Sequence, residues 1–504
     1  MERRAFFKLA GLSATAFAAG GMLGACSSVE HISNTLVPSA DSDGASQVST
    51  VVAQSPVSFS NSVDVLVVGS GVSGLSAAMA PAEAGYKVMV VDKLSLLGGE
   101  SYDADGIMHV AGSKLQKKAG FAQSAEDAWP ARKKELSAAG VGNLDFAKSL
   151  YLAAPRWVDR LSDSYGAQFA DPSTYGKEGV NDAVMLPKNG LGDMQSVMVP
   201  LRDGLSSKGA AFQTGYRAVA FILDESAVVC GMRFFVEESG SVIDVRAGVV
   251  VVATGGFASS QPLVSAHAPA LLRVGCFTYA SMGEGQELCR RAGGQLSGMD
   301  GTLPLTSDLP QVSAWGMFAP TLIVDAQGRR FAREDDVNAP ANACFSQDRG
   351  YWWTVFDKRI SDGSQSRSAA QMTSKYAKRL VGPCDDAAEL AAAIGVPADV
   401  LQATMERFDK LVSAGKDDDF GRTVNLKSLQ APYYAIKQLP VRYRTRGGVL
   451  TDENGRLTGT SGVSIRNVYC CGSVAANGGE GLASNGAFGM LVGEAVVSAL
   501  EAAR

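Results

Sequence analysis

The sequence predicts an α/β fold, because short apolar runs typical of buried strands lead directly into glycine-rich turns and helices. The clearest run covers residues 65–68 and enters the pattern Gly69-Ser70-Gly71-Val72-Ser73-Gly74, after which a helix is expected over residues 75–84. A second apolar run, at residues 87–91, ends at the acid Asp92. A strand, a G-x-G-x-x-G turn, a helix and a second strand with a terminal acid form the βαβ unit typical of dinucleotide binding.

The glycines and the acid of this unit each have a physical role. Gly69 allows the tight turn, Gly71 lets the backbone approach a pyrophosphate, and Gly74 lets the helix pack close to its strand. The helix N-terminus offers free N–H groups and the positive end of its dipole to the phosphates. Asp92 is placed to accept hydrogen bonds from a ribose. The alternative is a glycine-rich turn that binds no ligand.

A third strand, at residues 248–252, is apolar along its whole length and ends in small residues at 253–256. Such a strand is typical of a parallel sheet buried on both faces, and ligands lie beyond the carboxyl ends of its strands. The other elements expected along the chain are a tight turn at 98–101, helices within 124–165, a hairpin of strands 211–223 and 227–237, a helix over 286–292, a hairpin around 452–455, a strand at 467–472 and a final helix over 485–500.

Residues 297–443 differ in character from the rest of the chain. Helices are expected at residues 385–394 and 398–414, and Trp315, Trp352 and Trp353 are expected in loops. We interpret this stretch as a separate, mobile domain inserted between two parts of the dinucleotide-binding domain.

Composition and charge describe an ordinary globular protein. Apolar residues make up 46% and charged residues 19% of the 504 residues, a length that suggests two or three domains. The net charge of −5 argues against a nucleic-acid-binding surface, which needs a basic field.

The first 26 residues are expected to be an export signal. Arg3-Arg4 begin a twin-arginine pattern, and residues 23–26 resemble a lipobox in which Cys26 becomes lipidated. The alternative is a helix of the mature protein. Residues 27–60 are expected to be a flexible linker, and no transmembrane helix is expected beyond the leader. We therefore expect an extracytoplasmic lipoprotein at the cell membrane.

The cysteines and histidines give no sign of a metal centre. Seven cysteines follow Cys26 without any C-x-x-C pair, and the whole chain has three histidines. We therefore expect no c-type haem, iron–sulfur cluster or zinc site. Buried free thiols are expected, because an odd number of cysteines cannot all pair.

Several segments resemble the flavoprotein subunits of fumarate reductase and succinate dehydrogenase, especially the soluble, exported fumarate reductases. These segments are residues 69–74, 92–93, 98–99, 253–257, 328–331, 432–436 and 445–448. The resemblance covers residues 61–504. It implies a Rossmann-like FAD-binding domain of the glutathione-reductase type, formed by residues 61–296 and 444–504 and interrupted by an α+β capping domain, residues 297–443.

The resemblance implies FAD as the cofactor. A non-covalent FAD is expected, because only His109 stands near the region of the covalent link seen in some members, and a packed or solvent-facing role suits it better. The residues expected to bind FAD are Gly69, Gly71, Val72, Ser73, Gly74, Asp92, Lys93, Gly98, Gly99, Glu100, Ser101, Ala253, Thr254, Gly255, Gly472, Ser473, Ser484 and Asn485.

The residues that hold fumarate in this family are not retained. The proton-donating arginine falls at Asn338, and a substrate-binding histidine is replaced by Tyr443. The loop at residues 475–480 contains no arginine, and no histidine stands near residues 302–306. Loss of these groups removes much of the recognition of a dianion. Fumarate is therefore not the expected substrate, and an uncharged one is favoured.

Tyr443 and Arg444 are candidate catalytic residues. A neutral phenol can polarise a carbonyl or deliver a proton, as in the related ketosteroid dehydrogenases. Arg442, Arg444 and Arg446 alternate, so on an extended segment they should share one face, with Tyr443 on the other. The alternatives are a packing role for Tyr443 and a solvated face, or contact with acids of the cap, for the arginines.

Arg333 is the third catalytic candidate, as a substitute acid. It stands beside Glu334, Asp335 and Asp336, so a surface ion pair is the alternative. Glu480 is either a surface charge or a contact for a polar substrate group.

The resemblance thus implies an FAD oxidoreductase that reduces a carbon–carbon double bond conjugated to a carbonyl, by hydride transfer from flavin N5. Its electrons would come from a separate membrane-linked donor, a quinol or a cytochrome. The alternatives are a ketosteroid-type dehydrogenase that runs the reverse reaction and a catalytically decayed lipoprotein that binds flavin or relays electrons.

Overall fold

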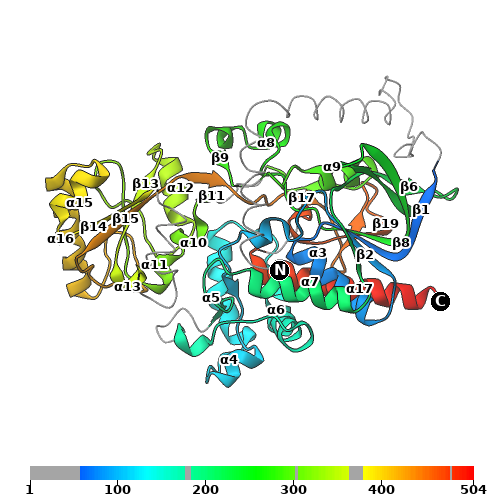
Figure 1. Cartoon of the computed structure of the whole chain (residues 1–504), viewed down its shortest axis with the longest axis horizontal. Coiled ribbons are helices and arrows are strands. Elements are labelled where there is room, and N and C mark those ends of the chain that lie inside the picture. The colour runs from blue at the N-terminus through cyan, green and yellow to red at the C-terminus, as the bar shows by residue number, and fades with distance from the viewer. Residues whose placement is uncertain (1–56, 176–182, 278, 301–304, 362–377, 477–479) are drawn as a thin grey trace, which may run out of the picture.

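The computed structural model describes residues 57–175, 183–277, 279–300, 305–361, 378–476 and 480–504. The expected export signal with Cys26, and the linker up to residue 56, lie outside these residues. Figure 1 shows two lobes, a large one built on an eight-stranded sheet and a smaller one that carries α15 (Ala387–Ile394) and α16 (Ala398–Ala414).

Parallel strands form the centre of the large lobe. β1 (Phe59–Val68) pairs parallel with both β2 (Val88–Val91) and β8 (Ser241–Val252). The sheet continues from β8 to β19 (Ser464–Cys470) and β18 (Arg456–Thr458), and from β2 to β5 (Ala211–Gln213). The β1 residues Val65 to Val67 are fully buried, so their apolar side chains, covered on both faces, confirm the predicted α/β class.

Residues 211–223, predicted as one strand, form two. β5 is the edge of the parallel sheet, whereas β6 (Tyr216–Leu223) pairs antiparallel with β7 (Val229–Val236). Gly215, with φ +74°, turns the chain between them. β8 also begins earlier than predicted, because residues 241–246 pair antiparallel with β7.

Helices pack against this sheet and against one another. α3 (Val72–Glu83) contacts β1 and β2, and α17 (Leu482–Ala502) packs along α3 and α6 (Leu144–Tyr165). The large lobe also carries α4 (Lys114–Lys118), α5 (Ala125–Ala138), α7 (Gln195–Ser207), α8 (Gln261–His267), α9 (Glu284–Arg291), the strand pair β3 (Met108–His109) and β4 (Val184–Met185), and the strand pair β10 (Leu296–Ser297) and β17 (Gly448–Val449).

The helix α17 is, within the described ranges, the one helix long and apolar enough to cross a membrane. The sequence prediction did not single it out. More than half of its most apolar stretch is buried inside the protein, against α3 and α6. Its packing is that of a core helix.

The smaller lobe is built on a four-stranded sheet of order β12-β13-β15-β14. Its elements are β12 (Leu322–Val324), β13 (Trp352–Asp357), β14 (Leu380–Cys384), β15 (Tyr433–Gln438), α10 (Pro310–Ser313), α11 (Trp315–Phe318), α12 (Ala339–Ser346), α13 (Lys358–Ser361), α15 and α16. Trp352 and Trp353 belong to the buried strand β13 and Trp315 opens α11, so their expected place in loops was wrong.

A small three-stranded sheet lies between the lobes. β16 (Pro440–Arg442) pairs with β11 (Leu305–Ser307) and with β9 (Gly275–Cys276), and Figure 1 shows β9 and β11 between the two larger bodies. Because β9 precedes residue 297, this sheet crosses the predicted domain boundary. The chain passes directly from β16 into the segment that carries Tyr443.

All seven cysteines of the described residues are free thiols. Five are buried as expected, whereas Cys230 and Cys276 are partly exposed. In the same part of the chain, no group of three or more His, Cys, Asp and Glu side chains could hold a metal ion.

Close contact between α17 and α3 predicts an effect on stability. A β-carbon at Gly489 would overlap the carbonyl oxygen of Ser73, and one at Gly493 that of Ala77. Gly489→Ala should therefore lower the free energy of unfolding by about 1–3 kcal/mol, although alanine favours an isolated helix by about 1 kcal/mol. Urea unfolding measures this change. Ser498→Ala, at an exposed position of the same helix, is the control, and equal stability of the two variants would contradict the packing argument.

Candidate cofactor and substrate site

A cleft opens at the carboxyl ends of β1, β2 and β8. Its empty volume is about 870 Å³, part of it open to solvent. Segments far apart in the sequence reach it, because the carboxyl ends of parallel strands lie at the same edge of the sheet. The predicted FAD-binding residues that line it are Gly69, Gly71, Val72, Ser73, Asp92, Lys93, Gly99, Glu100, Ser101, Ala253, Thr254, Gly255, Gly472, Ser473 and Asn485.

Three of the predicted residues do not line the cleft. Gly74 is packed behind the turn, where a β-carbon would overlap the carbonyl oxygen of Gly69. Gly98, with φ +115°, donates its N–H to Ser70 Oγ at 2.9 Å. Ser484 is buried in the first turn of α17. The structure gives these three residues a place in the framework of the cleft rather than on its surface.

The turn after β1 presents bare backbone to the cleft. Gly69 has φ +108°, and a β-carbon there would overlap the carbonyl oxygen of Ala253. At Gly71 a β-carbon would project into the cleft, with Ser101 Oγ as its nearest neighbour at 3.5 Å. Gly71 has no side chain to cap α3; the N–H of Val72 donates to Ser101 Oγ at 3.0 Å, and the N–H groups of Ser73 and Gly74, in the same first turn, have no intrahelical partners. This arrangement suits a pyrophosphate.

Asp92 marks one end of the cleft. Its Oδ2 accepts hydrogen bonds from the N–H and hydroxyl of Ser70, at 2.9 and 2.5 Å, and its Oδ1 accepts one from the N–H of Leu94 at 2.9 Å. A carboxylate has about four acceptor positions, so one remains for a ribose hydroxyl. The bonds with Ser70 also tie the end of β2 to the glycine-rich turn.

Two buried polar atoms of the cleft have no hydrogen-bond partner among the described residues. They are Thr254 Oγ1, beyond β8, and Asn485 Oδ1, on α17. A buried acceptor or hydroxyl without a partner is costly, so these atoms point to a polar ligand. Together with the bare turn and Asp92 they fit an adenine–flavin dinucleotide. When bound, FAD supplies hydride transfer at flavin N5.

Several residues of the cleft were missed by the sequence prediction. β6 contributes Tyr216, Arg217 and Ala218, and the segment that opens α9 contributes Ala280, Ser281 and Glu284. The first group was missed because residues 211–223 were predicted as one strand of a hairpin. The second had a signal, since Gly283-Glu284-Gly285 directly precedes the helix predicted over residues 286–292, but the segment was not assigned to the site.

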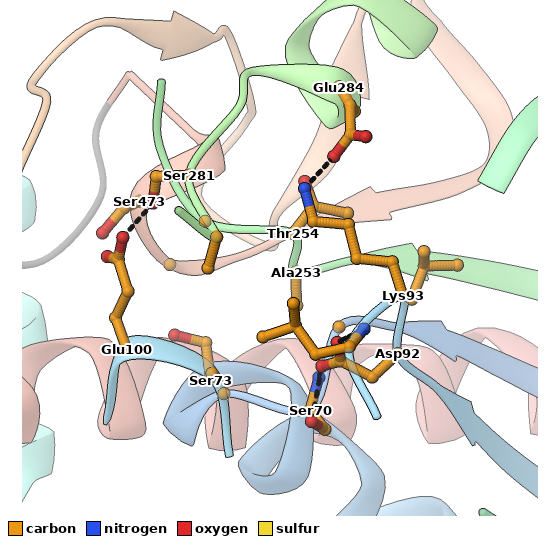
Figure 2. A pocket seen from close by; sticks show the side chains of 18 of the residues that line it. Ser70, Ser73, Asp92, Lys93, Glu100, Ala253, Thr254, Ser281, Glu284 and Ser473 are labelled. Atoms are coloured by element: carbon orange, nitrogen blue, oxygen red, sulfur yellow. Dashed lines mark hydrogen bonds and ion pairs between the residues drawn. The ribbon is translucent and has the colours of Figure 1, made fainter. Parts of the chain in front are cut away.

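Ser281 and Glu284 contact predicted FAD-binding residues across the cleft. Figure 2 shows the ion pair of Lys93 with Glu284 and the hydrogen bond of Ser281 with Glu100. In this view, Asp92 and Lys93 lie at one end of the cleft, and Glu100, Ser281 and Ser473 at the other. If the ribose lies at Asp92, the flavin ring lies toward Glu100.

Tyr443 belongs to a polar cluster beside Glu100. Burial raises the pKa of Tyr443 well above its usual value, and the negative charges of Glu100 and Asp105 raise it further. Its ring meets that of Phe277 edge to face at 4.9 Å between centroids. The phenol therefore stays protonated at neutral pH and can donate a hydrogen bond.

Arg444 is the positive centre of this cluster. Its guanidinium carbon lies 5.6 Å from the centroid of the Tyr443 ring. Burial lowers the pKa of His109 well below its usual value, and the charges of Arg132 and Arg444 lower it further. Burial raises the pKa of Asp105, opposed by the N–H of Ile107 and the charge of Arg444. We call Asp105, His109, Tyr443 and Arg444 the Tyr443 cluster.

The strand β16 ends at Arg442, so residues 443–446, over which the alternation was expected, do not belong to a strand of the structure. The guanidinium of Arg444 lies over the ring of Tyr443. Arg446 pairs with Glu480 at 2.9 Å, which gives Glu480 an ion-pair role.

Arg333 is engaged in the smaller lobe. Its Nε lies 2.6 Å from Asp335, whose other oxygen accepts the N–H groups of Thr423 and Val424. The hydrogen bond with Asp335 raises the pKa of Arg333, which makes it a weaker acid. The structure therefore favours the ion-pair interpretation of Arg333. It does not bring Arg333 to the cleft.

Comparison with known proteins agrees with this geometry. A family model described as an FAD binding domain matches residues 64–489, well over half of the chain. A fumarate reductase (cytochrome) of Shewanella frigidimarina is 27% identical over 453 residues, which cover 86% of this chain and 77% of that protein. A 3-oxosteroid 1-dehydrogenase of Mycobacterium tuberculosis is 25% identical over an alignment 527 positions long, which covers 82% of this chain and 93% of that protein.

A solved structure supports the fold. The open conformation of a flavocytochrome c3 fumarate reductase superposes with a TM-score of 0.66 at 23% identity, over 87% of this chain and 79% of that one. On the match of the family model over residues 64–489, the chain belongs to the family of flavoproteins with this FAD-binding domain, and FAD is its cofactor.

Proposed function

We propose that the protein is an FAD-dependent oxidoreductase that reduces a carbon–carbon double bond conjugated to a carbonyl. The observation that carries the proposal is the position of the Tyr443 cluster. It adjoins Glu100, at the end of the cleft where the flavin ring is expected. The names of the two relatives, a fumarate reductase and a 3-oxosteroid dehydrogenase, describe chemistry of this kind, in opposite directions.

The cluster suits an enone. Hydride addition to the β-carbon of an enone places negative charge on the carbonyl oxygen, and a positioned hydrogen-bond donor stabilises that charge. Tyr443, protonated at neutral pH, is such a donor, and the nearby positive charge of Arg444 acts in the same sense. The raised pKa that keeps the phenol protonated also makes it a weak acid, so Tyr443 acts here as the hydrogen-bond donor to the carbonyl oxygen, and the α-carbon takes up its proton from water.

Fumarate is not the substrate in this proposal. The residue at the family's proton-donating position is Asn338, which precedes α12 and bonds through its backbone to Asp336 and Asn342. Arg446 is neutralised by Glu480. A second carboxylate would therefore lack a strong partner at these positions.

Electrons reach the flavin from a separate donor in this proposal, a membrane quinol or a cytochrome. The export signal at residues 1–26 would place the protein outside the cytoplasm, and a lipidated Cys26 would hold it at the membrane where such donors work. This part of the proposal rests on the sequence alone.

Anaerobic reoxidation tests the function. The purified protein, its flavin reduced with dithionite, is mixed with cyclohex-2-enone, 4-phenylbut-3-en-2-one, 4-androstene-3,17-dione, cinnamate or fumarate, and flavin absorbance is followed. Reoxidation by an enone supports the proposal. Reoxidation by fumarate alone contradicts it. In a separate sample with oxidised flavin, flavin reduction by a saturated 3-oxosteroid would establish the reverse, dehydrogenase reaction. No response to any compound would favour the electron-relay alternative.

Replacement of the phenol tests the role of Tyr443. Tyr443→Phe should slow reoxidation by the best acceptor about 100-fold, because the donor to the carbonyl oxygen is lost. Flavin content and the rate of reduction by dithionite should not change. Tyr434→Phe is the matched control, since Tyr434 stacks on Phe356 in the smaller lobe. A Tyr443→Phe variant as fast as wild type would assign Tyr443 to packing.

Replacement of Cys26 tests the anchor. Cys26→Ala should move the exported protein from the membrane fraction to the soluble fraction, because an acylated cysteine supplies the anchor. Cys230→Ala, which removes a partly exposed thiol of the folded domain, should leave the protein at the membrane. Membrane attachment of the Cys26→Ala variant would show that another segment holds the protein.

A further inference from the structure

Two side-chain contacts cross the FAD cleft. Lys93, which follows β2, forms an ion pair with Glu284, which opens α9. At the other end, the hydroxyl of Ser281 donates to Glu100 Oε1 at 2.6 Å. All four residues line the cleft, and Figure 2 shows both contacts spanning it. The partners lie more than 180 positions apart in the chain, so each contact joins two walls that local structure does not connect.

The segment of residues 280–284 forms the outer wall of the cleft. Its backbone is held to the loop after β8, since the N–H of Ser259 donates to the carbonyl of Ser281 at 2.9 Å and that of Gly283 to Gly256 at 3.1 Å. Met282 is 41% exposed, so the wall faces solvent on its outer side. The Lys93–Glu284 ion pair and the Glu100–Ser281 hydrogen bond join this wall to the one that carries Lys93 and Glu100.

The Lys93–Glu284 ion pair is partly shielded from solvent, enough to influence a dissociation rate. The side chain of Lys93 is 22% exposed and that of Glu284 is 33% exposed, against 70% and 52% for Lys114 and Asp163, a pair on the outer surface. Exposed pairs contribute little, whereas partly desolvated pairs are screened less by salt and influence dissociation.

We propose that the Lys93–Glu284 and Glu100–Ser281 contacts form a clamp that closes the cleft over non-covalent FAD and sets the rate at which FAD leaves. FAD passes in or out only when both contacts open. Ser281 and Glu284 are thereby positioning residues of the cofactor site, from a segment outside the βαβ unit. This inference depends on FAD binding and not on the substrate proposed above.

Release of FAD from the holoprotein tests the clamp. The protein is diluted into an excess of a flavin-scavenging apoprotein, and release is followed by flavin fluorescence. Lys93→Met and Glu284→Gln should each release FAD about tenfold faster than wild type. Ser281→Ala should also be faster. Lys114→Met, which breaks the exposed pair, should match wild type. Wild-type rates in both Lys93→Met and Glu284→Gln would overturn the proposal.

A double-mutant cycle separates the ion pair from direct contacts of either residue with FAD. If the two side chains act through each other, K93M/E284Q should release FAD no faster than the single variants. The exchanged pair K93E/E284K should restore slow release. Independent effects, in which the double variant shows the product of the two single changes, would overturn the pairing. Added salt should speed release in wild type and have less effect in E284Q.

Discussion

The close approach of α3 to its neighbours is the constraint on which the cofactor site depends. Its first turn must present amides to a phosphate. This requires close contact of α3 with the turn after β1 and with the helix α17, and close contact of that turn with the loop after β8. Glycines at 69, 74 and 489 make these three contacts possible, since a β-carbon at each would overlap a carbonyl oxygen. Residues from the two ends of the chain therefore fix one helix N-terminus, and a shift of α17 would move the amides that hold the pyrophosphate.

Charge is distributed differently at the two ends of the site. Around Asp92 every charged group has a protein partner, because Asp92 accepts from Ser70 and Lys93 pairs with Glu284. Near Tyr443, Arg444 influences three titratable groups without a close ion pair among the described residues, and Arg442 has two buried nitrogens that no described group satisfies. Unpaired buried charge destabilises a fold, so its persistence here is typical of a ligand-binding region.

The local features of the cofactor site were predictable, and the contacts between distant segments were not. The G-x-G-x-x-G turn, Asp92 and the small residues after β8 are encoded within short stretches, so their place in the cleft follows from one known unit. Ser281 and Glu284 reach the cleft only through the packing of α9. The hydrophobic periodicity of the sequence does not indicate this packing. The alternation assumed for Arg442 to Arg446 required a strand, and β16 ends at Arg442. The ion pair of Arg333 could be anticipated from its acidic neighbours, whereas the proximity of Asp105 and His109 to Tyr443 depends on tertiary structure.

The direction of the reaction is not a property of the Tyr443 cluster. A donor that stabilises charge on a carbonyl oxygen lowers the barrier for hydride addition and for hydride removal alike, because both pass through the same transition state. The two relatives of this chain are named for opposite directions, in agreement with this symmetry. The direction of the reaction is then set by the redox partner that reduces or reoxidises the flavin. In the proposed reductase direction, the outside donor must reach the flavin while the cleft stays closed enough to retain it. Retention by the proposed side-chain clamp would meet both demands.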